Sequence, residues 1–239
     1  MSDTPPPSKA RKETLTSRIA DDLRARILRG ELPPGQKINL ERLREETAVS
    51  VSPLREAVSR LVAEGLVSFE DQRGYAVTPV SSADLAEITH LRGELETMAL
   101  EDAIAGGDLE WESEVMGTLY RLNRTERDPT RRATMEAWEE AHSAFHVALI
   151  SGCRQPRLLQ ICTTLRRLQD RYRRLFLLSS NPDSQRSVES EHRAIAESAT
   201  SRETARAKAL LRAHIEATGA ELRVRMEAAE RAERITGSG

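Results

Sequence analysis

Apolar residues recur at helical spacing in three successive runs near the start of the chain. They predict helices over residues 15–30, 40–47 and 52–65, separated by short turns. In the third run Ser52 is the expected N-cap, and Pro53 fits the first helical turn, where its missing N–H costs nothing. The basic and hydroxyl residues of this helix fall outside its apolar stripe. The helix therefore has one side for a core and one open, polar side.

The pattern changes from helical to strand-like after residue 65. Residues 66–69 and 75–77 flank a polar turn that Gly74 closes, which predicts a hairpin. Three helices followed by a hairpin form a winged helix-turn-helix, in which the third helix enters the major groove of DNA. A glycine at the hairpin tip allows the backbone to approach the duplex closely. The alternative is an ordinary small amphipathic helix followed by an ordinary hairpin.

Helical periodicity continues from residue 80 to the C-terminus. The predicted helices cover residues 82–107, 108–124, 130–150, 155–178, 184–199 and 202–234. The face of the first that is expected to point inward contains Leu85, Ile88, Leu91, Leu95 and Met98. The corresponding face of the fourth contains Leu158, Ile161, Leu165, Leu168, Tyr172 and Leu175. Six amphipathic helices in succession predict a bundle.

These patterns predict a mainly α protein in three parts. Residues 1–14 form a disordered arm, residues 15–79 a winged helix-turn-helix (three helices plus a β-hairpin wing), and residues 80–239 an all-α bundle. A content of 31% charged and 3% aromatic residues agrees with a helical protein. No run of 18 apolar residues indicates a membrane span, and the start of the chain lacks the apolar core of a secretory signal. Two cysteines, Cys153 and Cys162, form no disulfide framework, so a cytoplasmic location is expected.

Net charge gives little support to nucleic-acid binding by itself. Residues 1–79 contain 13 lysines and arginines against 12 acidic residues, which leaves a charge of +1. A strongly basic domain would have indicated nucleic acid directly. If the first third of the chain binds DNA, its basic side chains must therefore gather on one face.

The histidines of the second half are candidate metal ligands. His142 and His146 are four residues apart on one predicted helix, so both imidazoles leave the same face. His192 and His214 lie on two further helices and could converge on the first pair. Histidines at this spacing are also common at surfaces and in satisfied cores. The spacing alone leaves the choice open.

An enzyme is the weaker interpretation of these histidines. A zinc protease helix has the pattern HExxH, in which the glutamate activates water. Here Ser143 occupies the position of that glutamate. The sequence also lacks a nucleophile elbow, a phosphate loop and a dinucleotide fingerprint. A metal-dependent hydrolase and a purely structural helical dimer remain the alternatives to a regulator.

Several stretches resemble a known family of bacterial regulators. Residues 15–79 are similar to the winged helix of the GntR family through RGELPPG, SPLREAVSRLVAEGLV and RGYAV. The second half resembles the all-helical FCD effector domain of the FadR subfamily through LRGELE, FHVALISGC, EHRAI and RAHIE. The resemblance implies a homodimeric, ligand-responsive DNA-binding regulator, most often a repressor, which binds a palindromic operator.

The resemblance also implies a set of DNA-contacting residues. Arg55 stands at the family's recognition-helix arginine, and Gly74 at its wing glycine. Two other arginine positions of the family do not match, because Glu41 and Val51 occupy them. The operator preferred by typical members should therefore not be assumed. The expected DNA-binding set is Arg42, Arg44, Ser52, Arg55, Arg60, Arg73 and Gly74.

Metal-binding members of the family use one aspartate and three histidines. His146, His192 and His214 match the three histidines, whereas His142 occupies the aspartate position. Replacing a carboxylate by a neutral ligand leaves the site about one unit more positive, which favours a dianionic effector. Nitrogen ligands suit Zn²⁺ best, with Ni²⁺ or Mn²⁺ as further possibilities.

Further segments resemble the glutarate-sensing regulators of this subfamily. They are HSAFHVALISGC, GDLEWE and RYR. The implied effector is glutarate or a related dicarboxylate, and a different organic or sugar acid is the alternative. The expected effector-binding residues are Arg92, Arg171 and Tyr172. For Arg92 an exposed i, i+4 ion pair with Glu96 is the competing interpretation.

Overall fold

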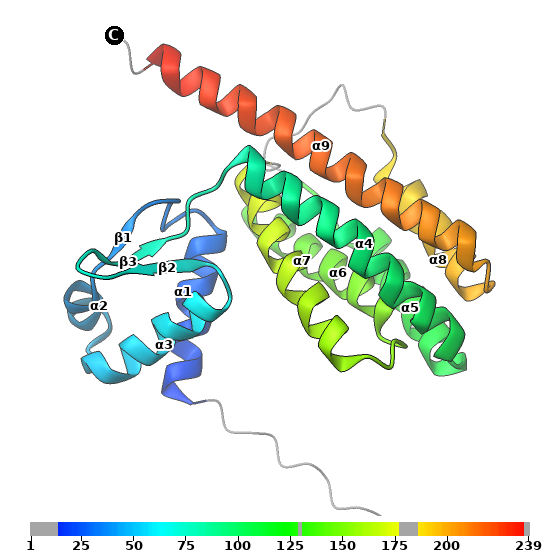
Figure 1. Cartoon of the computed structure of the whole chain (residues 1–239), viewed down its shortest axis with the longest axis horizontal. Helices are drawn as coiled ribbons and strands as arrows, with labels where there is room; N and C mark the ends of the chain where they lie inside the picture. Colours follow the sequence, from blue (N-terminus) through cyan, green and yellow to red (C-terminus); the bar gives the residue numbers. More distant parts are fainter. Residues whose placement is uncertain (1–13, 129–130, 177–185, 237–239) are drawn as a thin grey trace, which may run out of the picture. The chain divides into compact units, whose positions relative to one another are not determined.

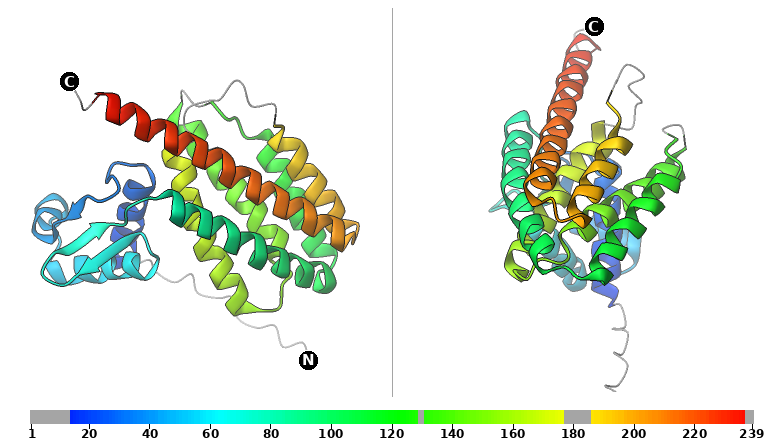
Figure 2. Two further views of the ribbon diagram at one scale, coloured as in Figure 1. Left: turned by 45° about the horizontal axis from the view of Figure 1, so that its top comes forward. Right: turned by 90° about the vertical axis from the view of Figure 1, so that its right-hand side faces the viewer.

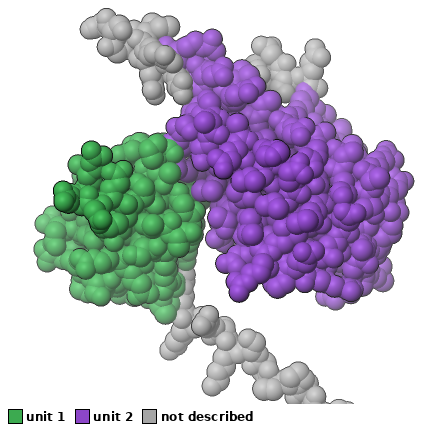
Figure 3. All heavy atoms as spheres, viewed as in Figure 1, with its two compact units in different colours: residues 1–79 green, residues 80–239 purple. Residues whose placement is uncertain are grey.

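The computed structural model describes residues 14–128, 131–176 and 186–236 (Figure 1). The chain divides into two compact units, residues 1–79 and 80–239 (Figure 3). Residues 1–13 of the predicted arm lie outside the described residues, as does the predicted boundary between the fourth and fifth helices of the bundle. Within the described ranges no helix is both long enough and apolar enough to cross a membrane.

The first unit is a winged helix-turn-helix, as the sequence predicts. Its elements in chain order are α1 (Leu15–Leu28), β1 (Lys37–Ile38), α2 (Leu40–Thr47), α3 (Val51–Ala63), β2 (Val67–Glu70) and β3 (Gly74–Val77). β3 lies between β1 and β2 in an antiparallel sheet. The two-residue β1 was not predicted, because two residues are too few for an alternating pattern. Leu23, Leu54 and Leu61 are buried between α1 and α3.

The start of α3 differs from the prediction. Ser50, rather than Ser52, is the N-cap residue, and α3 begins at Val51. Ser52 is therefore an exposed residue of the first helical turn. Any of the first four N–H groups of a helix lacks an intrahelical acceptor, so Pro53 fits either start equally well. Ala48 adopts a left-handed conformation (φ 55°), which ends α2 two residues before the cap.

The second unit is a six-helix bundle within the described residues. Its elements are α4 (Ser82–Gly106), α5 (Leu109–Arg124), α6 (Arg132–Ile150), α7 (Pro156–Phe176), α8 (Val188–Thr200) and α9 (Thr204–Thr236). α4 packs along both α7 and α9, while α5 packs against α6 and α8 (Figures 1 and 2). Phe145, Leu149, Ile195 and Leu211 belong to one buried cluster between these helices.

Two of the predicted inward faces are wrong in part. Leu91 and Met98 of α4 are 36% and 44% exposed, and Ile161 of α7 is 49% exposed. The residues that α4 and α7 bury instead include several charged side chains, among them Arg92 and Arg166. A pattern that counts apolar residues as buried cannot detect charged groups that are buried because they pair across helices.

Candidate metal centre and nucleic-acid interface

α3 presents its polar side to solvent, as a recognition helix requires. Its buried residues are Leu54, Ala57, Val58 and Leu61, so that the residues between them face outward. Arg55 is exposed and has no ion-pair partner among the described residues. Arg60, one turn later, is bonded to Glu56 and to Ser17 of α1. Arg55 is therefore the arginine of α3 that is available to a ligand.

The other predicted DNA-binding residues are accessible, but their arginines form ion pairs with nearby acidic residues. Arg42 pairs with Glu46. Arg44 and Arg73 pair with acidic residues three positions away in the chain. Exposed ion pairs of this kind contribute less than about 1 kcal/mol to stability, so DNA phosphates can displace the carboxylates from these arginines. Gly74 has φ 81°, a conformation that a residue with a side chain rarely adopts.

Replacing Arg55 with alanine is expected to weaken operator binding by about 10- to 100-fold. The unpaired guanidinium projects from the exposed side of α3, so its removal deletes a direct contact without breaking an internal one. Fluorescence anisotropy with labelled DNA from upstream of the gene measures this effect. Arg206→Ala, a change of the same charge on α9, is the control. Unchanged affinity in Arg55→Ala would show that α3 does not read the groove.

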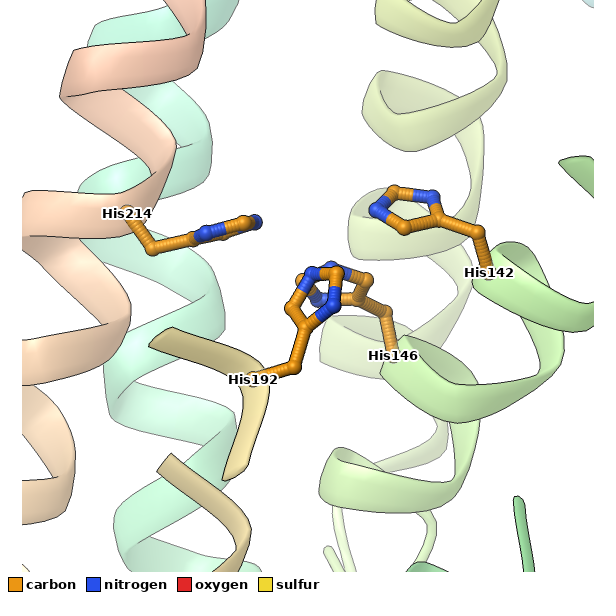
Figure 4. A group of neighbouring side chains, drawn as sticks. All are labelled: His142, His146, His192 and His214. Atoms are coloured by element: carbon orange, nitrogen blue, oxygen red, sulfur yellow. The ribbon is translucent and has the colours of Figure 1, made fainter. Parts of the chain in front are cut away.

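Four histidines converge in the centre of the bundle (Figure 4). α6 supplies His142 and His146, α8 supplies His192, and α9 supplies His214. One nitrogen from each ring lies within 4.8 Å of the others, and all four side chains are buried. The structure therefore brings together every one of the predicted metal ligands.

Neighbouring rings hold the histidines in position. Trp138 stacks on His142 with the ring centroids 4.8 Å apart. Phe145 lies against both His146 and His192, at 5.3 and 5.1 Å. Packed aromatic rings restrict the imidazole rotamers, so the four nitrogens stay aimed at a common point.

Four of the eight ring nitrogens of these histidines are buried and have no hydrogen-bond partner among the described residues. The unpartnered buried atoms include His142 Nδ1, both nitrogens of His146, and His192 Nε2. Leaving buried polar atoms unpaired costs about 1–3 kcal/mol each, so such a cluster indicates a missing ligand. The Nδ1 atom of His214 is 2.7 Å from Oε2 of Glu191. That bond leaves His214 Nε2 as the nitrogen available to a metal ion.

Burial keeps these imidazoles neutral, which is the state that binds metal. Desolvation lowers the pKa values of His142 and His146 well below the usual value, and the charges of Arg173 and Arg166 lower them further. Desolvation also lowers the pKa of His192, to about 2, and that of His214. A neutral imidazole retains the lone pair that a metal ion needs.

The same pKa shifts predict that the metal-free protein is sensitive to acid. The folded-state pKa values lie below the unfolded value of about 6.5, so the unfolded chain binds more protons below that pH. The free energy of unfolding should therefore fall as pH drops below about 6.5, by up to about 1.4 kcal/mol per pH unit for each neutral histidine. Urea unfolding in a chelator between about pH 7.5 and 5 measures this slope. His90→Ala, which removes an exposed histidine, should leave this pH dependence unchanged. A free energy of unfolding that does not change with pH over this range would contradict the lowered pKa values.

The donor set fits a divalent transition metal. Nitrogen atoms up to 4.8 Å apart approach the separation of about 4.2 Å between opposite ligands of a six-coordinate ion with 2.1 Å bonds. Imidazole ligands suit zinc, copper, iron and nickel better than magnesium or calcium. Glu191, held by Arg186 at 2.6 Å, supplies the carboxylate that commonly orients a metal-binding histidine.

Buried ion pairs surround the histidines. The first pair is the predicted one between Arg92 and Glu96, at 2.6 Å, but it is buried rather than exposed. Arg166 of α7 bonds to the same carboxylate at 3.3 Å, and its Nε and Nη2 atoms have no partner. The second pair joins Arg173 to Glu139 of α6 at 2.5 Å.

Sequence analysis missed Arg166, Arg173 and Glu139. Their charges are balanced by residues on other helices, and such long-range pairs leave no local signal. The repeated arginines of α7 within an otherwise apolar pattern were the one available hint. Arg173 and Arg166, rather than Arg171, are the cations of α7 whose charge acts on His142.

The two predicted effector residues of α7 occupy a different part of the bundle. The Tyr172 hydroxyl accepts a hydrogen bond from the Ser81 N–H at 3.1 Å and donates to Asp84 at 2.6 Å. The Tyr172 ring packs with Leu222 and other residues in a cluster separate from the core around Phe145. Arg171 is buried, and burial lowers its pKa. The structure thus places Tyr172 at the beginning of α4.

A cavity reaches the histidines from the end of α5. Its volume is about 340 Å³, which is within the range of small-molecule sites. His192 and Trp138 are among its lining residues, and Arg127 and Arg186 contribute two guanidinium groups. Arg127 lies over the Trp138 ring at 4.4 Å. The cavity therefore combines one candidate metal ligand with two guanidinium groups and the carboxylate of Glu189.

A winged helix joined to a helical domain with a buried histidine cluster defines a class of ligand-responsive transcriptional regulators. Residues 15–77 match the family model for bacterial regulatory proteins of the gntR family, and residues 87–217 match the FCD domain. The chain belongs to the GntR family and contains an FCD domain. It is a DNA-binding regulator, not an enzyme.

The particular relatives agree with this class. The chain is 37% identical over 222 residues to the HTH-type transcriptional regulator BphR of Paraburkholderia xenovorans. The matched residues make up 91% of this chain and 89% of BphR. It is 35% identical over 191 residues to the HTH-type transcriptional repressor GlaR of Escherichia coli, covering 79% and 87%. The structure of E. coli McbR/YncC has a TM-score of 0.72 at 22% identity and covers 87% of this chain and 97% of that one, which supports the fold.

Proposed function

We propose that the protein is a cytoplasmic repressor that leaves its operator when a small dicarboxylate binds at a divalent metal ion in the FCD domain. The observation that carries this proposal is the buried cluster of His142, His146, His192 and His214, whose nitrogens converge and half of whose nitrogens have no hydrogen-bond partner among the described residues. Such a cluster is unfavourable unless a cation occupies it. Zinc is the metal that the donor set favours, with nickel or manganese as alternatives.

Charge balance supports a dianionic effector. Arg92, Arg166 and Arg173 are balanced by three carboxylates, Glu96, Glu139 and Asp170. The four histidines are neutral, so nothing among these groups compensates the two positive charges of the metal ion. When bound, the metal supplies a cation that a carboxylate group can ligate. Glutarate or a closely related dicarboxylate matches this charge.

The cavity beside His192 gives the effector a second anchor. Arg127 lines it, and a guanidinium group binds carboxylates in two-point geometry, whereas the Arg186 guanidinium there is already bonded to Glu191. Arg92 donates hydrogen bonds to Glu96 and Gln169, so its guanidinium group would lie beside the ligand and add to the positive potential there without binding it directly. A sugar acid or another organic acid would bind through the same metal with its hydroxyl groups in this cavity.

The proposed response depends on α7. This helix carries Arg166 and Arg173 beside the histidines, and Tyr172 anchors Ser81 and Asp84 at the start of α4. An effector that displaces α7 would therefore act on the residues that directly follow Pro79. Repression would be relieved to the extent that the effector prefers the conformation with weaker DNA affinity. Two copies would bind a palindromic operator.

One experiment tests the proposal as a whole. Binding to DNA from upstream of the gene is measured with the zinc-loaded protein, with and without glutarate, and again after chelation. We expect glutarate to weaken DNA binding of the zinc-loaded protein and to have no effect after chelation. Other dicarboxylates and gluconate distinguish effector classes. Sequence-specific DNA binding that no acid changes, at any metal content, would refute the effector proposal.

A further inference from the structure

Arg166 of α7 is a buried arginine whose guanidinium group is only partly bonded. Its side chain is 3% exposed, and its Nη1 atom donates a hydrogen bond to Oε2 of Glu96 at 3.3 Å. Nε and Nη2 are buried and have no hydrogen-bond partner among the described residues. Leaving a buried donor unpaired costs about 1–3 kcal/mol, and more when the group is charged. Arg166 therefore has two strong donors that await an acceptor.

The two unpartnered atoms lie on the same edge of the guanidinium group. Their N–H bonds point in parallel, so this edge can bind both oxygens of one carboxylate. Three other arginines of the bundle bind a carboxylate through this same pair of atoms. They are Arg92 on Glu96, Arg173 on Glu139 and Arg186 on Glu191. We call the edge formed by Nε and Nη2 of Arg166 the open edge.

The polar residues one turn after Arg166 on α7 are already bonded to other arginines. Gln169 accepts a hydrogen bond from Arg92. Asp170 accepts a hydrogen bond from Arg173 at 2.7 Å. Neither side chain can turn toward Arg166 without leaving another buried guanidinium group unpaired, which would transfer the cost rather than remove it. The acceptor for the open edge must therefore come from outside these neighbours.

The charges around Arg166 indicate that this acceptor is an anion. Arg92 and Arg166 share the single carboxylate of Glu96, which leaves one positive charge uncompensated. Arg173, two turns later on α7, is bonded to two carboxylates. Burial lowers the pKa of Arg166, and Glu96 offsets this only in part, whereas the burial of Arg173 is outweighed by its two carboxylates, which raise its pKa. Arg166 is thus the buried arginine that lacks a second negative group.

Arg166 acts at the histidine cluster rather than at the cavity beside it. Burial lowers the pKa of His146, and the charge of Arg166 is the next largest cause of that shift. Arg166 is not among the residues that line the cavity containing Arg127 and His192. The two guanidinium groups of Arg166 and Arg127 are therefore placed to meet different parts of one ligand.

We propose that the open edge of Arg166 binds the effector carboxylate that lies at the histidines, through paired hydrogen bonds from Nε and Nη2. The inference rests on the proposed function for the statement that the effector is a carboxylic acid. It adds the residue that selects a carboxylate at the inner end of the site. A primary amide has one acceptor oxygen instead of two, so it leaves one of the donors unpaired and binds less well.

The first test keeps the charge of Arg166 and removes the open edge. Arg166→Lys retains a cation beside Glu96 but has no pair of parallel donors. In the zinc-loaded full-length protein it should weaken glutarate binding by about 10- to 100-fold, as isothermal titration calorimetry measures. Arg167→Lys, at the exposed neighbouring residue, should bind glutarate within about twofold of the wild type.

Two controls show that Arg166→Lys acts on the acid and not on the rest of the site. Its zinc affinity, from competition with a chromogenic chelator, should equal that of the wild type. Its circular dichroism spectrum should also be unchanged, because the charge that pairs with Glu96 remains. Glutarate affinity in Arg166→Lys equal to that of the wild type would overturn the proposal.

The second test observes the open edge in the wild type, so it does not depend on how a variant folds. The Nε–H signal of Arg166 is followed by nuclear magnetic resonance in protein labelled with ¹⁵N-arginine, after assignment by through-bond correlation to its backbone. Acetate, the probe for a single carboxylate, should shift this signal saturably, and so should glutarate. Acetamide should not. A shift with chloride as large as that with acetate would overturn the assignment of a carboxylate.

The outcomes separate this inference from the regulatory proposal. If acetate shifts the Arg166 signal while no acid changes DNA binding, the open edge is confirmed as a carboxylate site and the regulatory proposal fails. If glutarate releases the wild type and Arg166→Lys from DNA at the same concentration, the assignment of Arg166 fails alone. The assignment also fails if neither acetate nor glutarate shifts the signal, in the zinc-loaded and in the chelated protein.

Discussion

Replacing His146 with alanine is expected to reduce the zinc affinity of the protein by at least about 100-fold. The imidazole is buried beside His142 and His192, and neither of its nitrogens has a hydrogen-bond partner in the described part of the chain, so both are free to ligate a metal ion. Removing one of four ligands also leaves the others converging on an incomplete site. Competition titration with a chromogenic zinc chelator measures the loss.

His90→Ala controls for a general effect of losing a histidine, because His90 is exposed on α4. His192→Ala, on a different helix, should reproduce the loss of zinc affinity. Both ligand variants should keep DNA affinity in the absence of effector, because the winged helix is a separate compact unit. Wild-type zinc affinity in His146→Ala would mean that the cluster is not the metal site.

Glu139→Ala is expected to lower the free energy of unfolding by about 3 kcal/mol. Glu139 and Arg173 are 5% and 4% exposed, and the carboxylate accepts bonds from two guanidinium nitrogens. Removing one partner of a buried pair leaves the other charge desolvated without compensation, which typically costs about 3–5 kcal/mol. Asp170 remains bonded to Arg173, so the loss should lie at the lower end. Chemical denaturation measures it.

The neighbouring exposed residue provides the control for this variant. Glu140→Ala removes the same charge from the same helix and should change the free energy by less than about 0.5 kcal/mol. A loss below about 1 kcal/mol in Glu139→Ala would show that Asp170 alone compensates Arg173.

The order of elements could be predicted from local spacing, and the convergence of the four histidines from spacing together with the resemblance to a known family. Helical periodicity located α1 to α3 and the six bundle helices, and the i, i+4 spacing placed His142 and His146 on one face. The resemblance to a known family then identified His192 and His214 as their companions. Where the spacing left a register ambiguous, as at Ser52, the prediction was displaced by two residues.

The charged interior could not be predicted from spacing. Arg166 and Glu96 are separated by 70 residues in sequence, so the pairing depends on how α4 and α7 pack. Once these groups occupy the interior, the leucine rows of both helices rotate toward solvent. A prediction that counts hydrophobicity alone therefore assigns Ile161 of α7 to the interior together with Leu158 and Tyr172, although only the latter two are buried.

The unbroken course of α7 has a consequence for how quickly the protein can respond. Arg173 beside the histidines and Tyr172 at the start of α4 are adjacent residues of one rigid rod. A displacement of Arg173 therefore moves Tyr172 directly, as a small tilt or turn of α7, with no segment melting and refolding. We therefore expect switching on the microsecond-to-millisecond scale of helix shifts, so that the lag in gene expression reflects metabolite supply rather than the protein.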